Sequence, residues 1–168
     1  MRKHKLRYTA FVGMVLVAFM LIATSCLPSG KQFHSYRSMP SCGWVWGDTI
    51  LFVTPLSDSL THYRYTIEVR HDNSYPFRQL AVAFSVNPVD KPAIYSDTLT
   101  CQLSNDQDVW QGQGWGNLFV STHLGHTFTI PHSGSYMLSL SHIMKQDTLP
   151  GIFNVGIKIE TAGDAYQE

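Results

Sequence analysis

Two short segments alternate so regularly between apolar and other residues that they restrict the chain to β structure. In His62–Arg70, one face consists of Tyr63, Tyr65, Ile67 and Val69. In Gln79–Val86, one face consists of Leu80, Val82, Phe84 and Val86, opposite the small residues Ala81, Ala83 and Ser85. A period of two is that of a strand with one buried face. Each segment is therefore predicted to be a strand that lies over a core.

Five further segments of similar length have strand-forming composition and are bounded by Pro, Gly, Asn, Asp and Ser. They are Asp48–Thr54, Ala93–Leu103, His126–Ile130, Gly134–Ile143 and Asn154–Glu160. No segment sustains a helical period, and the weak helix candidate is Ile143–Gln146. Short strands separated by turns, with no crossover helices, favour antiparallel pairing. We predict an all-β fold: an antiparallel two-sheet sandwich, jelly-roll-like, preceded by a signal peptide.

The N-terminus predicts export. Four basic residues, Arg2, Lys3, Lys5 and Arg7, precede the uncharged apolar run Ala10–Ala23. A membrane-spanning helix needs about 20 apolar residues, and this run is shorter than that. A basic flank followed by a short apolar run is typical of a secretory signal peptide.

Small residues and then a cysteine end this run, in the order Ala23, Thr24, Ser25, Cys26. The arrangement resembles the lipobox of bacterial lipoproteins, in which the cysteine is acylated and becomes the new N-terminus. Cys26 is therefore the predicted lipid attachment site, and residues 1–25 are the predicted lipoprotein signal peptide. Two other interpretations stay open, namely a cleaved signal with an incidental Cys26 and an uncleaved anchor.

Composition divides the rest of the chain. Residues 26–43 are rich in Ser, Pro and Gly and are predicted to form a flexible tether. Residues 44–160 form the predicted β-sandwich domain, and residues 161–168 a tail. The 12 basic and 12 acidic residues give a formal net charge of +0 at pH 7, with no basic patch. Nucleic acid is therefore excluded as an expected partner.

Besides Cys26, the chain holds two cysteines, Cys42 and Cys101. In an oxidising compartment such as the periplasm, they are a candidate disulfide. Two free thiols are the alternative, and only the distance between the residues decides.

A glycine-rich, tryptophan-containing segment, Ser104–Phe119, interrupts the strand pattern. Trp110 and Trp115 stand among Gly112, Gly114 and Gly116. Two indoles between glycines can form a stacking platform for a sugar or a peptide. They can equally plug the open end of a β-sandwich, because buried aromatic side chains contribute strongly to core packing.

Metal binding and catalysis have weak signals. Asn105, Asp106 and Asp108 are close in sequence, but a calcium loop takes about six to eight oxygens and usually a bidentate Glu, and none follows. His123, His126 and His132 have no acidic residue between them, although zinc needs about three or four converging ligands. No nucleophile motif is present. We therefore expect no metal site, no cofactor and no enzyme activity.

Several motifs occur together in an order that resembles one family. They are "SMPSCGW" at Ser38–Trp44, "HDNSYPFRQL" at His71–Leu80, "DTLTCQL" at Asp97–Leu103, "WQGQGWGNL" at Trp110–Leu118 and the block Pro131–Glu160. Together they resemble the gliding motility lipoprotein GldH family of Bacteroidota, and the signal with Cys26 agrees with it.

The resemblance implies a lipid-anchored, non-enzymatic protein of the cell envelope, associated with the gliding apparatus and type IX secretion. It implies no catalytic residues. The expected partners are the membrane, through the N-terminal lipid, and other envelope proteins. In Bacteroidota, an acidic run after the lipidated cysteine promotes surface display, but the residues here are "LPSGK". We therefore expect the periplasmic face of the outer membrane. The alternative is a carbohydrate- or peptide-binding module that uses Trp110 and Trp115.

Overall fold

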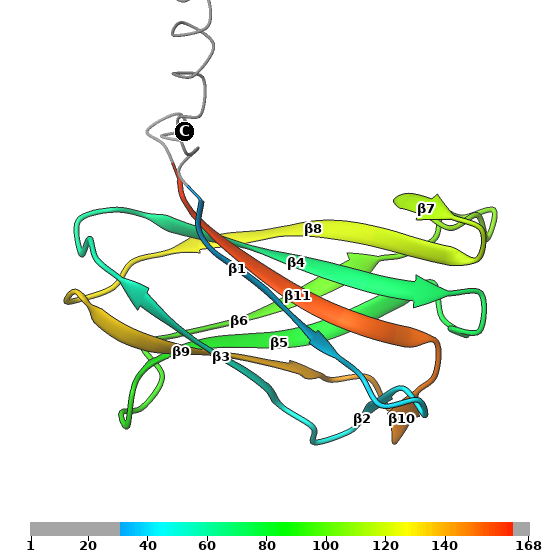
Figure 1. Ribbon diagram of the computed structural model, residues 1–168, viewed down its shortest axis with the longest axis horizontal. Coiled ribbons are helices and arrows are strands. Elements are labelled where there is room, and N and C mark those ends of the chain that lie inside the picture. The colour runs from blue at the N-terminus through cyan, green and yellow to red at the C-terminus, as the bar shows by residue number, and fades with distance from the viewer. Residues whose placement is uncertain (1–30, 163–168) are drawn as a thin grey trace, which may run out of the picture. The chain divides into compact units, whose positions relative to one another are not determined.

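The computed structural model describes residues 31–162, which form eleven strands and no helix. No helix that is long and apolar enough to cross a membrane occurs in this described part. The strands, labelled in Figure 1, are β1 Lys31–Ser38, β2 Trp44–Val45, β3 Ile50–Leu56, β4 Tyr63–Asp72, β5 Gln79–Pro88, β6 Tyr95–Gln102, β7 Gln113–Trp115, β8 Leu118–Phe128, β9 Gly134–His142, β10 Thr148–Leu149 and β11 Ile152–Thr161.

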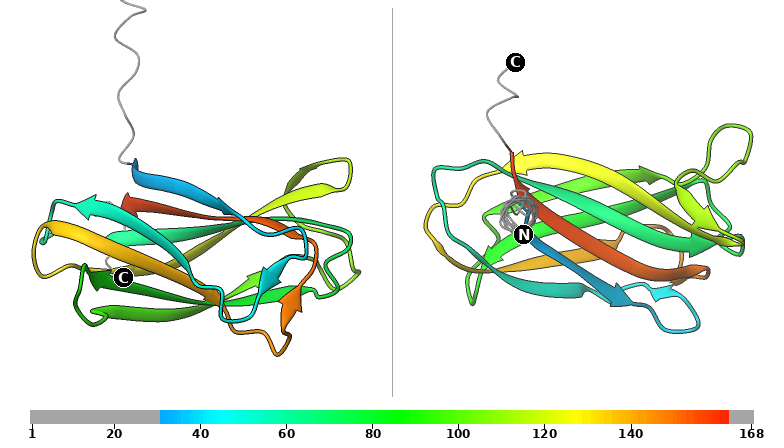
Figure 2. Two further views of the ribbon diagram at one scale, coloured as in Figure 1. Left: turned by 60° about the horizontal axis from the view of Figure 1, so that its bottom comes forward. Right: turned by 45° about the horizontal axis from the view of Figure 1, so that its top comes forward.

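The strands form two sheets that face one another (Figure 2). One sheet has the order β1-β11-β4-β8-β7 and the other the order β3-β9-β5-β6, and a small β10-β2 pair stands apart. Every pair is antiparallel. Without the short strands β2, β7 and β10, eight strands remain, four in each sheet, and the orders β1-β11-β4-β8 and β3-β9-β5-β6 are those of a double Greek key. This is the jelly-roll arrangement, so the predicted fold class is confirmed.

The core lies between the sheets and follows the two alternating segments. Tyr63, Tyr65, Ile67 and Val69 of β4 are fully buried, and so are Leu80, Val82 and Val86 of β5, with Phe84 almost so. Both segments are strands, as predicted. The inward residues of β9 and β11 complete the same core. Burying one face of each strand fixes its register, because a one-residue slip would expose the whole apolar set.

The predicted tether is wrong over Lys31–Ser38, which forms the edge strand β1. β1 pairs with β11 from Lys31 opposite Glu160 to Ser38 opposite Asn154. Phe33 packs against the core, with its ring 6.1 Å from that of Phe52. This strand was not predicted because most of its residues are polar, and its alternation becomes evident only from its pairing with β11. Residues 1–30, which include the predicted signal peptide and Cys26, and residues 163–168 lie outside the described part.

Two smaller predictions also need correction. The strand expected at His126–Ile130 begins earlier, because β8 spans Leu118–Phe128 and pairs with β7 inside the glycine- and tryptophan-rich segment. The weak helix candidate Ile143–Gln146 is an irregular connection after β9. Its backbone is held instead by a hydrogen bond from the Ile143 amide to the Ala81 carbonyl.

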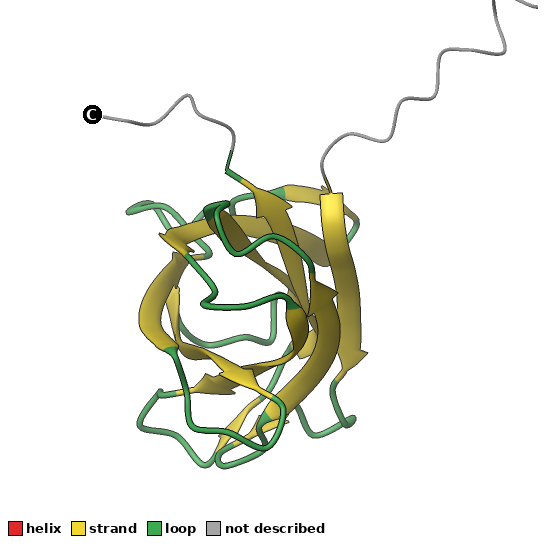
Figure 3. Cartoon of the chain, turned by 90° about the vertical axis from the view of Figure 1, so that its left-hand side faces the viewer, coloured by secondary structure: helices red, strands yellow, loops and turns green. Residues whose placement is uncertain are grey.

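The topology gathers the loops into two sets at opposite ends of the sandwich. The loops 57–62, 89–94 and 129–133 lie at one end of the sandwich, beside Lys31 and Thr161. We call this end the near end. The register places them together: Lys31 opposes Glu160, Thr161 opposes Tyr63, and Tyr63 opposes Phe128. We call far end the opposite set, which includes β7 and the β10-β2 pair. The near end is at the left of Figure 1 and faces the viewer in Figure 3.

Candidate functional site on the four-stranded sheet

The outward face of the four-stranded sheet carries no charged side chain. Alternate residues of β3, β9, β5 and β6 point into the core, so the others face outward. The outward residues are Leu51, Val53, Pro55, Ser135, Met137, Ser139, Ser141, Gln79, Ala81, Ala83, Ser85, Asn87, Ser96, Thr98, Thr100 and Gln102. We call this set the uncharged face. Lys, Glu, Arg and Asp side chains are nearly always found at the surface, so an outward sheet face without any of them is unusual.

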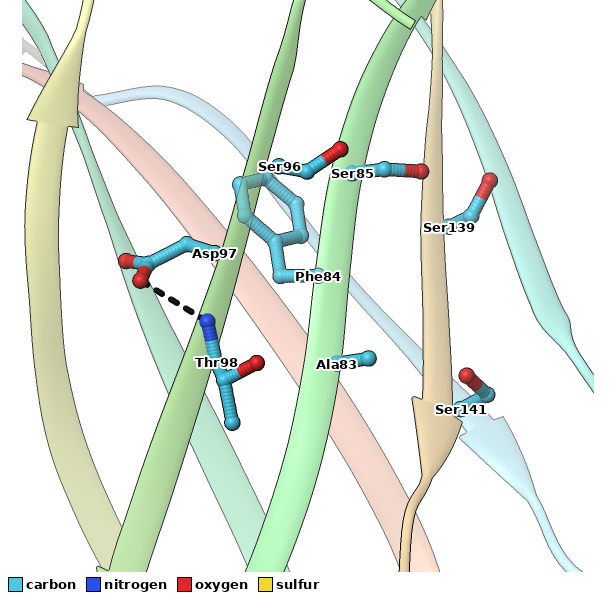
Figure 4. Close-up of a pocket in the computed structure, with 8 residues that line it drawn as sticks. All are labelled: Ala83, Phe84, Ser85, Ser96, Asp97, Thr98, Ser139 and Ser141. Atoms are coloured by element: carbon cyan, nitrogen blue, oxygen red, sulfur yellow. Dashed lines mark hydrogen bonds between the residues drawn. The ribbon is translucent and has the colours of Figure 1, made fainter.

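The small side chains leave a shallow hollow of about 420 Å³ in this face. Figure 4 shows its lining, which consists of Ala83, Phe84, Ser85, Ser96, Asp97, Thr98, Ser139 and Ser141. The hollow extends over β6, β5 and β9. Beside it, on the edge strand β3, Leu51 is 50% exposed and Val53 is 60% exposed. A surface of hydroxyls and small apolar groups loses little solvation free energy when a partner covers it, because no ion is desolvated.

Asp97 lies on β6 and faces the opposite way, into the gap between the sheets. Its carboxylate accepts hydrogen bonds from Tyr65 Oη at 2.5 Å, Tyr95 Oη at 3.0 Å and the Thr98 amide at 2.8 Å. Nδ1 of His126, on β8, lies 2.8 Å from the same carboxylate. The Asp97 cluster therefore ties β6 of one sheet to β4 and β8 of the other.

This hydrogen bonding determines the ionisation of Asp97. Burial alone would raise the pKa of its carboxyl group, but the bonds from Tyr65, His126, Thr98 and Tyr95 outweigh burial and lower the pKa to about 2. Burial and the Asp97 charge raise the pKa of Tyr65, and they raise that of Tyr95 to about 12. At neutral pH the cluster is thus a carboxylate surrounded by neutral hydroxyl donors.

Gly125 makes the cluster possible. It lies on β8 directly under the ring of Tyr65, and a Cβ atom at this position would overlap the ring. Only glycine lets the tyrosine cross β8 closely enough to reach Asp97. His126, next along β8, is 76% exposed. Within residues 31–162, no serine, threonine or cysteine side chain hydrogen-bonds to it. The cluster therefore acts as a bridge between the sheets.

The outward face of the five-stranded sheet differs sharply from the uncharged face. Glu68 on β4 lies 3.2 Å from the His34 ring nitrogen and accepts a hydrogen bond from Tyr36 Oη. The guanidinium of Arg70 stacks 4.5 Å from the centre of the Tyr36 ring. Lys158 pairs with Glu160 at 2.8 Å. Charged, mutually paired side chains are ordinary for a solvated sheet face, so the candidate site lies on the other sheet.

The structure separates the two tryptophans of the candidate binding platform. Trp110 is half-buried against the core, with its ring 4.8 Å from His71 and 6.1 Å from Phe119. It bridges to Ser104 and covers the far end of the sandwich, as an end plug would. Trp115, on β7, is 93% exposed and pairs with Leu118 across the hairpin. The two indoles therefore do not form one stacking platform.

The acidic and histidine clusters do not converge on a metal. Asp108 pairs with Arg78, with 2.9 Å between Oδ2 and the guanidinium. The Asn105 side chain accepts hydrogen bonds from backbone amides of its own turn. Of the three histidines, His126 contacts Asp97, whereas His123 is only partly buried and makes no such contact. No group of three or more potential metal ligands occurs in the described part of the chain.

The candidate disulfide between Cys42 and Cys101 is not formed. Both cysteines are free, with Cys42 exposed and Cys101 fully buried on β6. Burial raises the pKa of the Cys101 thiol to about 12, so it stays protonated and unreactive. Cys26, the predicted lipid attachment site, lies outside the described residues.

Comparison of the sequence with known proteins shows which family the chain is related to. The sequence model of the family described as GldH lipoprotein matches residues 31–159, most of the chain. The chain belongs to the GldH lipoprotein family. The gliding motility lipoprotein GldH of Flavobacterium johnsoniae is 27% identical over 157 residues, which cover 88% of this chain and 94% of that protein. The matched region contains every strand of both sheets except the final residues of β11.

Solved structures resemble this chain only loosely. VP2 in a subviral particle of infectious bursal disease virus aligns with a TM-score of 0.35 and 14% identity, covering 79% of this chain and 31% of that one. The CBM22-1–GH10 modules of xylanase 10B from Clostridium thermocellum, complexed with xylohexaose, align with a TM-score of 0.36 and 12% identity, covering 83% and 30%. This chain thus spans less than a third of either. Neither likeness bears on function.

The uncharged face and the Asp97 cluster were both missed from sequence. The uncharged face could have been predicted, because Ala81, Ala83 and Ser85 in Gln79–Val86 are small and uncharged, and the outward residues of the neighbouring segments are uncharged as well. The Asp97 cluster could not have been predicted in this way, because Tyr65, Asp97 and His126 come from separate segments that meet only in the folded chain.

Proposed function

We propose that this GldH-family lipoprotein is a non-enzymatic component of the gliding and type IX secretion machinery. It is anchored through Cys26 to the periplasmic face of the outer membrane, and its uncharged face docks on an envelope partner protein. The family membership supports the association with gliding motility. The observation that carries the docking proposal is the uncharged face itself, with Leu51 and Val53 exposed along its edge.

The chemistry of the face suits protein docking better than sugar binding. Carbohydrate sites commonly offer an aromatic ring for stacking, and no outward position of β3, β9, β5 or β6 holds one. The stacking alternative relied on Trp110 and Trp115, but Trp110 packs against the core while Trp115 is almost fully exposed. A flat face of small side chains permits close approach, and Leu51 and Val53 add apolar area that a partner would bury.

The docking proposal is tested by placing one charge on the face. Thr98→Lys puts an ammonium group on an exposed position of the uncharged face. Thr122→Lys puts one on an exposed position of the outward face of the five-stranded sheet and serves as the control. In the native host lacking its own copy, Thr98→Lys is expected to impair secretion of type IX cargo, whereas Thr122→Lys leaves it intact. Both variants should keep the melting temperature of the parent. Equal secretion by the two variants would contradict docking through this face.

The anchor is tested separately. Mass spectrometry of the mature N-terminus from native membranes should find an acylated Cys26, and Cys26→Ser should release the protein from the membrane. Protease added to intact cells should leave the protein uncut, and permeabilising the outer membrane should expose it. An unmodified N-terminus cut elsewhere, or digestion in intact cells, would overturn the anchor or its orientation respectively.

A further inference from the structure

The near end carries a leucine held out in solvent by a well-bonded loop. Leu60 is 92% exposed. Asp58 accepts a hydrogen bond from the Leu60 amide at 2.8 Å and another from the Thr61 hydroxyl. The buried Tyr63 hydroxyl accepts from the Asp58 amide at 3.0 Å and donates to the Asp58 carbonyl at 2.9 Å. Leu60 is therefore exposed on a turn that several hydrogen bonds define.

A second apolar feature lies at the same end. The loop 89–94 and the loop 129–133 border a hollow of about 530 Å³. Its lining combines exposed Val89 and Ile94 with prolines, and it includes Lys91 and His132. Figure 3 looks directly onto these loops and the loop of Leu60. The near end thus presents apolar side chains from two separate loops, together with Lys91 and the exposed carboxylates of Asp58 and Asp90.

The chain itself brings this end toward a bilayer. Four residues lie between Cys26 and Lys31, and the five residue-to-residue steps that join them span at most about 18 Å. The polar headgroup layer takes up several ångströms of this distance. Lys31 lies at the near end, and the far end is separated from it by strands of ten residues, or about 33 Å. A lipid on Cys26 therefore holds the near end close to the surface and keeps the far end away.

From these observations we propose that the near end docks on the lipid surface of the membrane that holds Cys26. Leu60, Val89 and Ile94 enter the boundary between headgroups and acyl chains. The inference rests on the proposed anchor and adds an orientation to it. The strands then run away from the bilayer surface, and the uncharged face stands roughly perpendicular to the membrane plane. Trp115 at the far end lies in the aqueous space.

Short-range quenching by doxyl-labelled lipids tests this orientation. The lipidated protein carrying Cys42→Ser is purified from membranes and placed in phosphatidylcholine vesicles. A fluorescent thiol label is attached at Leu60→Cys, at Thr98→Cys on the uncharged face, or at Asn117→Cys at the far end. Cys101 is buried and an acylated Cys26 has no free thiol, so only the new cysteine is labelled. Ile94→Cys serves as a second near-end position that keeps Leu60.

The expected result is quenching that is severalfold stronger at positions 60 and 94 than at 98 and 117. Quenching at 60 and 94 no stronger than at 117, in protein that still sediments with the vesicles, would overturn the docking while leaving the anchor intact. Quenching at 98 as strong as at 60 would show a sandwich lying on its side and would also overturn the proposal. Protein that does not associate with vesicles and takes label at Cys26 would refute the anchor, and the orientation with it.

Discussion

Replacing Gly125 by alanine tests whether the close crossing of Tyr65 over β8 holds the two sheets together. The backbone of Gly125 is not in the left-handed region, so alanine adds no backbone strain, and the whole effect comes from the added methyl group. That methyl group would overlap the Tyr65 ring, which must move, and its hydroxyl then loses the 2.5 Å hydrogen bond to Asp97.

The size of the effect follows from these two losses. Overpacking a close contact costs about 1–3 kcal/mol, and a hydrogen bond to a charged group contributes about 1.5–3 kcal/mol. The reduced entropy of the unfolded chain returns about 0.5–1 kcal/mol when glycine becomes alanine. Gly125→Ala should therefore lower the free energy of unfolding by about 2–5 kcal/mol. With an m-value of about 2 kcal/mol/M, the urea midpoint should fall by about 1–2.5 M.

The assay is equilibrium urea unfolding of a chain that begins at residue 27, followed by fluorescence. The matched control is the same substitution in a Tyr65→Leu background, where the ring and its hydrogen bond are already absent. There Gly125→Ala should cost less than about 1 kcal/mol, because contacting residues give non-additive effects. An equal cost in both backgrounds, or almost none in the parent, would refute the close-crossing explanation.

Three further outcomes are expected. Burial lowers the pKa of His71 and His123 below 6.5, so the contribution of these two histidines to stability is complete above about pH 6.5 and declines as pH falls below it. Urea midpoints measured across this range would show the decline, and His123→Gln should make the decline smaller. Acidic residues in place of Leu27–Gly30 should bring the protein to the cell surface, where protease added to intact cells would cut it. Maleimide should modify Cys42 in the folded chain and Cys101 only after denaturation, as intact-mass measurements would show.

Local patterning was enough to predict the central strands, because each buries one face completely. The alternation of β4 and β5 appears directly in the sequence, and the same residues form the core. β1 was beyond such reasoning, because its outward residues are polar and its identity as a strand depends on β11, more than a hundred residues later.

The candidate sites divide in the same way. Trp110 and Trp115 share one glycine-rich segment, yet the bridge from Trp110 to Ser104 turns one indole onto the core, while the β7–β8 hairpin carries the other into solvent. Composition cannot make that distinction. The Asp97 cluster is harder still, because its hydrogen bonds join three strands and depend on the missing side chain of Gly125.

The pairing of the first strand with the last has a consequence for the timing of folding. β1 is made more than a hundred residues before β11, the strand that lies between it and β4. At about 5–20 residues per second, β11 is synthesised several seconds after β1. Such non-local pairing makes folding slow. A chain truncated before β11 would lose the strand that joins β1 to the sheet, and would leave two unpaired strand edges exposed to aggregation.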